Sequence, residues 1–117
     1  MRKKNFKGKC EKRIFSKCKS VCKTYDPVQS AYAGVLENNP EVIEFRCNEE
    51  LVDLEIGAYT TDFVCVKSTG ELMVRECLYH KLISRPQTAK LLDASRNYWL
   101  KRGVKDWGIV VDEADEE

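Results

Sequence analysis

The chain has 117 residues, of which 43% are hydrophobic and 33% are charged, and its formal net charge is +1. These values are typical of one soluble globular domain with one core. No apolar run approaches the ~20 residues that span a bilayer, and no apolar segment follows the basic N-terminus, so a membrane partner and a secretory signal are not expected. We therefore expect a cytoplasmic protein whose six cysteines are thiols.

The charges are distributed unevenly. Residues 1–25 contain ten Lys or Arg and one acid, whereas residues 112–117 contain five acids and no base. We expect residues 1–9 to be a disordered basic arm, residues 10–111 to be the domain and residues 112–117 to be an acidic tail. A basic segment of this kind is typical of proteins that bind the phosphate backbone of nucleic acids. The residues expected to bind DNA are Arg2, Lys3, Lys4, Lys7, Lys9, Lys12 and Arg13. The alternative is that both ends only keep the protein in solution.

The segment 10–22 has apolar side chains at helical spacing, which predicts a short basic amphipathic helix. Its cysteines, Cys10, Cys18 and Cys22, together with Cys47 would suffice for a zinc site. However, their spacing matches none of the common zinc-binding patterns. The pattern therefore favours buried thiols on a helical stripe over zinc.

A second helix is expected from Asp26-Pro27, because Asp is a good N-cap and Pro fits the first helical position. It should end at Asn38-Asn39-Pro40, since the residue before Pro is disfavoured in a helix. A strand is expected over 41–46, with Cys47 a candidate extension, and another near 51–56.

Two apolar runs, 59–66 and 71–78, flank Ser68-Thr69-Gly70 and predict a β-hairpin. A long helix then begins at Ser84-Arg85-Pro86 and should end at Gly103. The nearly all-apolar run 106–111 is typical of a strand buried on both faces and parallel to its neighbour. The expected fold is an α/β domain, a small mixed β-sheet with a central hairpin flanked by helices.

The register of the hairpin brings two acids together. If Lys67 lies opposite Glu71, then Asp62 lies opposite Glu76, at the end of an apolar face. Their Cβ atoms would be about 4.5–5.5 Å apart. Like charges at that distance are destabilising unless they are neutralised, and a divalent metal commonly does so. The alternative is an ordinary surface ion pair of Glu76 with Arg75 or Arg46.

Several short motifs have the same order as in a known group of nucleases. They are Tyr59-Thr60-Thr61-Asp62-Phe63, then Gly70, then Val74-Arg75-Glu76, then Tyr98-Trp99 followed by Gly103. Over about residues 26–111 the chain resembles the PD-(D/E)xK nuclease superfamily, above all the TnsA-type endonuclease subunit of heteromeric transposases. The resemblance implies a restriction-endonuclease-like fold that cuts DNA at the ends of a mobile element. It also implies that Asp62 and Glu76 are catalytic and hold Mg²⁺.

The sequence departs from the motif of this superfamily at two positions. Leu78 stands two residues after Glu76, where the resemblance implies a lysine, and Gln29 stands nearest the position of a helix acid. Lys81 is the candidate replacement for the catalytic lysine, because its long side chain is able to reach back. His80 and Lys90 are alternatives to it, and Glu37 is a candidate replacement for the helix acid.

Two functions remain open at this stage. One is a Mg²⁺-dependent endonuclease that acts at transposon ends. The other is a catalytically inactive protein on the same fold, an accessory or inhibitor from a phage or transposon that binds nucleic acid or a protein partner. The missing lysine favours the second function, and the pair of Asp62 and Glu76 favours the first.

Overall fold

The computed structural model describes residues 10–52, 54, 57 and 59–112. Its elements in chain order are β1 (Glu11–Arg13), β2 (Cys22–Thr24), α1 (Pro27–Glu37), β3 (Val42–Leu51), β4 (Tyr59–Lys67), β5 (Leu72–Leu78), the short 3-10 helix η1 (His80–Leu82), α2 (Pro86–Lys101) and β6 (Asp106–Val111). None of the helices in this part of the chain is long and apolar enough to cross a membrane. The expected basic arm and all of the acidic tail except Asp112 lie outside the described residues.

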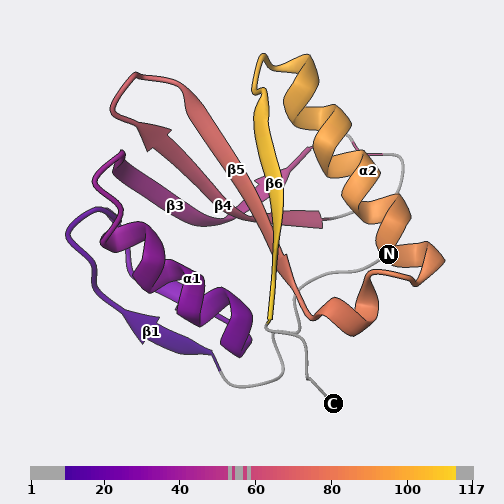
Figure 1. Cartoon of the computed structure of the whole chain (residues 1–117), viewed down its shortest axis with the longest axis horizontal. Coiled ribbons are helices and arrows are strands. Elements are labelled where there is room, and N and C mark those ends of the chain that lie inside the picture. The colour runs from indigo at the N-terminus through magenta and orange to yellow at the C-terminus, as the bar shows by residue number, and fades with distance from the viewer. Residues whose placement is uncertain (1–9, 53, 55–56, 58, 113–117) are drawn as a thin grey trace.

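The main sheet has the strand order β3-β4-β5-β6 (Figure 1). Strands β3, β4 and β5 are antiparallel, whereas β6 is parallel to β5 and is connected to it through α2. Strands β1 and β2 form a separate antiparallel pair. The prediction of a small mixed α/β domain with a central hairpin is therefore confirmed.

The two helices lie on opposite sides of the sheet (Figure 1). On one side, α1 packs through Ala33 and Leu36 against a cluster that includes Phe45 and Phe63. On the other side, α2 packs through Leu91 and Trp99 against a second cluster. The sheet thus separates two small cores.

Local signals placed both helices correctly. The Asp26 side chain accepts a hydrogen bond of 2.8 Å from the Gln29 N–H, and Pro27 is the first residue of α1. Helix α2 begins at Pro86, and Gly103 follows its end with φ of +85°, a conformation that glycine adopts without strain. The turn of the central hairpin closes in the same way at Gly70, with φ of +91°.

The helix predicted over 10–22 is wrong, because this segment forms the β1–β2 hairpin and its loop. A buried helical stripe would cover Ile14, but Ile14 is 87% exposed. Instead, the Glu37 carboxylate accepts hydrogen bonds from the backbone N–H groups of Ser16 and Lys17. The Phe45 N–H also donates to the Lys17 carbonyl at 2.9 Å. Contacts with distant parts of the chain therefore override the local periodicity.

Two strand predictions also need correction. The strand expected near 51–56 does not form in the described residues, because Leu51 is the last residue of the ten-residue strand β3. Strand β6 is not buried on both faces, since Ile109 and Val111 are 42% and 40% exposed. It lies at the edge of the sheet, where its only neighbour in the described structure is β5.

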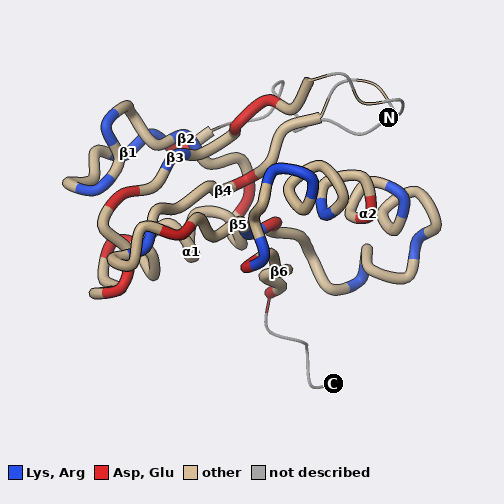
Figure 2. The backbone as a smooth tube through the Cα atoms, turned by 90° about the horizontal axis from the view of Figure 1, so that it is seen from above, with Lys and Arg blue, Asp and Glu red and all other residues tan. Residues whose placement is uncertain are grey.

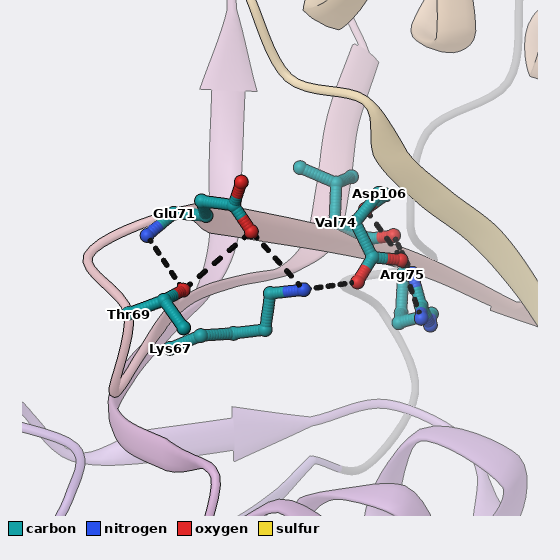
Figure 3. A network of polar contacts seen from close by, with 6 residues as sticks. All are labelled: Lys67, Thr69, Glu71, Val74, Arg75 and Asp106. Carbon is teal, nitrogen blue, oxygen red and sulfur yellow. Dashed lines mark hydrogen bonds and ion pairs between the residues drawn. The ribbon is translucent and has the colours of Figure 1, made fainter.

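Strand β6 is attached to the hairpin through Asp106 (Figure 3). The Asp106 carboxylate contacts Lys67 Nζ and Arg75 Nη2, each at 2.8 Å. Arg75 Nη1 also donates to the Asp106 carbonyl at 3.2 Å. Gly108 leaves room for this arginine, because a Cβ atom there would lie 3.3 Å from Arg75 Nη1. One carboxylate thus fixes the start of β6 against both strands of the hairpin.

We predict that Asp106→Asn lowers the melting temperature near neutral pH. Hydrogen bonds from Lys67 and then Arg75 lower the pKa of Asp106. The stabilisation is therefore present above the ordinary aspartate pKa of about 3.9 and is lost as the pH falls below it. Thermal unfolding of Asp106→Asn and wild type should converge in acid. The control is Asp93→Asn, because Asp93 forms an exposed ion pair with Arg96 at 3.8 Å. An equal effect of both substitutions would contradict the role of Asp106.

Candidate functional site

The strands of the central hairpin pair in the predicted register, with Val64 opposite Val74 and Phe63 opposite Arg75. Beyond this point, two side chains take over the hydrogen bonding between the strands. The Asp62 N–H donates to Glu76 Oε1 at 3.2 Å, and the Cys77 N–H donates to Asp62 Oδ2 at 2.6 Å. The prediction that Asp62 and Glu76 lie together is therefore confirmed.

The second oxygen of Glu76 connects the pair to other elements. Ser95 on α2 donates from its hydroxyl to Glu76 Oε2 at 2.5 Å. Trp107 on β6 in turn donates from its indole N–H to the Ser95 oxygen at 3.0 Å. The Tyr59 side chain also hydrogen-bonds Glu76. Three residues thus link Glu76 to α2, β6 and the start of β4.

Sequence reasoning missed the role of Ser95 and Trp107. Ser95 lies on the packed face of α2, one turn before Trp99, whose indole N–H donates to Thr61 Oγ1 at 3.0 Å. A serine on the apolar face of a helix indicates a buried hydrogen bond, because a buried hydroxyl needs a partner. The identity of that partner depends on how α2 docks on the sheet.

Burial determines the charge of the pair. Asp62 is 2% exposed and Glu76 is 1% exposed. Loss of hydration raises the pKa of Glu76 to about 7, and the nearby charge of Asp62 adds to this effect. Hydrogen bonds from Ser95, the Asp62 N–H and Tyr59 oppose it. Glu76 therefore binds a proton in the neutral range, and the pair carries less charge than two ionised carboxylates.

Hydrated Mg²⁺ does not fit between these residues as they lie. Three of the four carboxylate oxygens already accept hydrogen bonds from the chain. The adjoining cavity has a volume of about 10 Å³ and is lined largely by apolar side chains, including Leu78, Leu82 and Leu91. That volume holds one water at most, whereas Mg²⁺ keeps several waters.

The candidate replacements for the catalytic lysine lie elsewhere. Lys81 is exposed, and its ammonium group lies 5.8 Å from the ring centroid of Tyr79, which packs on the α1 side of the sheet. His80 contacts Asp112 through its ring at 3.1 Å and through its backbone N–H at 2.6 Å. Lys90 is exposed on α2. None of these contacts directs a cation towards the carboxylate pair.

The residues near the position of the helix acid have structural contacts. Gln29 is fully buried; its Oε1 accepts from the Tyr25 N–H at 2.9 Å, and its Nε2 donates to Asn48 at 3.0 Å. Glu37, as described above, binds the loop between β1 and β2. Both side chains hold the N-terminal part of the chain to the domain.

The alternative of a surface ion pair at Glu76 is wrong. Arg75 binds Asp106, and Arg46 contacts Glu49 at 3.5 Å. Glu76 itself is buried, so it is unavailable to either arginine from the solvent side. Its partners are the hydroxyl groups of Ser95 and Tyr59 and the Asp62 backbone N–H rather than cations.

The residues expected to contact DNA divide into three groups. Lys12 is exposed on β1. Arg13 is half-buried; it donates to Ser30 on α1, and its guanidinium lies 4.7 Å from the Phe15 ring centroid. The remaining residues lie outside the described part of the chain, and they are Arg2, Lys3, Lys4, Lys7 and Lys9.

Comparison of the sequence with protein-family models gave no match, and comparison with curated proteins gave no significant match.

We predict that Glu76→Gln removes a pH dependence of stability. Because folding raises the pKa of Glu76 from about 4.5 to about 7, the free energy of unfolding of the wild type should fall as the pH rises through this range. The full effect is on the order of 3 kcal/mol. Urea unfolding between pH 5 and pH 9 measures it. The control is Glu50→Gln on the exposed side of β3; equal pH dependence in wild type and Glu76→Gln would contradict the prediction.

Proposed function

We propose that this chain is a nucleic-acid-binding protein with a restriction-endonuclease-like core whose carboxylate pair is structural rather than catalytic. The observation that carries this proposal is the burial of Asp62 and Glu76 in hydrogen bonds with the chain itself. The missing lysine supports it, because Leu78 is buried beside the pair. An origin in a mobile genetic element follows from the motif resemblance and is part of the proposal.

The mixed sheet supports the nuclease-like core. The carboxylates lie where β4 and β5 part, and the parallel strand β6 follows through α2. In the superfamily that the motifs resemble, this hairpin carries the catalytic acids. Here the same positions provide hydrogen bonds that replace the missing ladder between the two strands.

The β1–β2 hairpin supports nucleic-acid binding. Lys12 lies directly opposite Lys23 in the register, and both are exposed. Like charges in opposite positions destabilise a strand pair, so an anion that binds between them is favoured. Lys19, in the loop of the same hairpin, has a side chain that is 86% exposed and lies 4.0 Å from the Glu44 carboxylate, an exposed contact that a phosphate is able to replace. These three lysines belong to the basic stretch 1–25 of the sequence, and exposed cations of this kind suit a phosphate backbone.

We predict that the triple substitution of Lys12, Lys19 and Lys23 by Gln weakens binding to duplex DNA at least tenfold. The slope of log affinity against log salt should also decrease by up to about 3, because each phosphate contact contributes about 0.9. Fluorescence anisotropy with labelled duplex and single-stranded DNA measures both quantities.

The matched control replaces by Gln three exposed cations outside the hairpin, Lys90 and Lys101 on α2 and Lys105 before β6. Figure 2 shows that Lys and Arg also occur along α2, so the control removes the same charge from a second basic region. Equal losses in the two triple variants would show that only net charge matters and would contradict a binding surface on the hairpin.

A Mg²⁺-dependent endonuclease at transposon ends is the second candidate function, and the proximity of Asp62 and Glu76 favours it. A plasmid-nicking assay with Mg²⁺ or Mn²⁺ separates the two candidates. We expect no nicking by the wild type at high protein concentration. Nicking by the wild type that Asp62→Asn abolishes would replace the structural account with a catalytic one.

A further inference from the structure

Three cysteine side chains converge beside the β1–β2 hairpin. The sulfur atoms of Cys18, Cys22 and Cys47 all lie within 4.8 Å of one another. Thiolates on one tetrahedral zinc ion are about 3.8 Å apart, because each Zn–S bond is about 2.3 Å long. A small contraction of the cluster is therefore enough to place all three sulfurs on one ion.

The three cysteines come from two distant parts of the chain. Cys18 lies in the loop between β1 and β2, Cys22 is the first residue of β2, and Cys47 lies within β3. Cys18 and Cys22 are buried. A metal held by these three cysteines would connect the N-terminal hairpin to the main sheet. The sequence spacing of Cys18 and Cys22 alone does not indicate such a connection.

Backbone groups are directed at two of the sulfurs. The Ser20 N–H hydrogen-bonds Cys18, and the Lys23 N–H hydrogen-bonds Cys47. Such donors stabilise the negative charge of thiolate ligands and orient them on a metal. Arg13 lies opposite Cys22 in the β1–β2 register. Its positive charge offsets the net charge of −1 that three thiolates and one Zn²⁺ carry together.

Asn48 fixes the backbone next to Cys47. It has a positive φ of 58°, which a residue other than glycine adopts only rarely. Its side chain donates to the Lys23 carbonyl at 2.7 Å and accepts from Gln29 at 3.0 Å. The unusual conformation is therefore held by both β2 and α1, at the residue that follows a member of the thiol cluster.

The β1–β2 hairpin itself provides little regular structure. Strands β1 and β2 have three residues each, and an isolated two-stranded pair is marginally stable. Two apolar residues of the segment 10–24 are exposed, Ile14 at 87% and Val21 at 44%. A metal would add to the hydrogen bonds that already hold this hairpin to α1 and β3. Disulfides would leave one of three thiols unused, whereas zinc uses all three.

We propose that Cys18, Cys22 and Cys47 bind one Zn²⁺ in a structural site that anchors the β1–β2 hairpin to β3. Thiolate ligands select zinc over harder cations, and the thiols release their protons to solvent when the metal binds. The fourth ligand is Cys10, which immediately precedes β1, or a water molecule. The proposal does not rest on nucleic-acid binding, so either one can fail without the other.

Metal content of the full-length chain tests the proposal. After purification under reducing conditions in the presence of zinc, native mass spectrometry should show one zinc per chain. Co²⁺ added to the metal-free wild type should give thiolate-to-cobalt charge-transfer absorption with a stoichiometry of one. A chain that binds neither metal at micromolar concentration overturns the proposal.

Variants identify the ligands. Cys47→Ser should lose the stoichiometric zinc and the charge-transfer band, whereas Cys65→Ser, at a buried thiol outside the cluster, should keep both. Trp99 and Trp107 lie in the core on the α2 side, and their fluorescence reports whether that core remains folded. Zinc retained by a triple Cys18, Cys22 and Cys47 to Ser variant would also overturn the proposal. If the three-cysteine site binds metal, the charge-transfer band of Cys10→Ser identifies the fourth ligand. A weaker band assigns it to Cys10, and an unchanged band assigns it to water.

Discussion

The hydrogen bonds that the carboxylates of Asp62 and Glu76 accept between β4 and β5 are the constraint on which the rest of the domain depends. Where the ladder between β4 and β5 ends, each carboxylate accepts from a backbone N–H of the other strand. Glu76 also accepts from Ser95, which is itself held by Trp107. The buried Glu76 side chain therefore connects the hairpin to α2 and, through Ser95, to β6. Removal of an acceptor oxygen would leave buried donors without partners.

In this structure Asp62 and Glu76 accept hydrogen bonds from the chain, whereas a metal-dependent nuclease uses paired acids as metal ligands. Catalysis requires carboxylate oxygens that are open to metal and water, together with a cation that orients the water. Here three of the carboxylate oxygens accept hydrogen bonds from the chain. The buried side chain of Leu78 occupies the position at which a nuclease would have its lysine. Lys and Arg occur on the N-terminal hairpin and along α2 (Figure 2), and Lys12, Lys23 and Lys90 among them are exposed. The buried carboxylate pair and the exposed cations therefore lie in different parts of the domain.

Local signals were sufficient for the hairpin and the helices, because alternation, Gly70 and the Asp26 cap act within a few residues. They failed for residues 10–22, whose structure depends on Glu37, Phe45 and Cys47 from elsewhere in the chain. The sequence placed Asp62 beside Glu76 through the register. Their burial was not predictable, because it depends on how α2 and β6 dock on the sheet.

The protonation of Glu76 itself tests the central claim most directly. Carbon-13 NMR of the glutamate carboxyl groups, assigned by comparison with Glu76→Gln, follows this residue through a pH titration with and without millimolar Mg²⁺. A structural, buried pair predicts a midpoint near the pKa of about 7 that Mg²⁺ leaves unchanged. A midpoint near that of an exposed glutamate, or one that Mg²⁺ lowers, would contradict the account and indicate an open metal site.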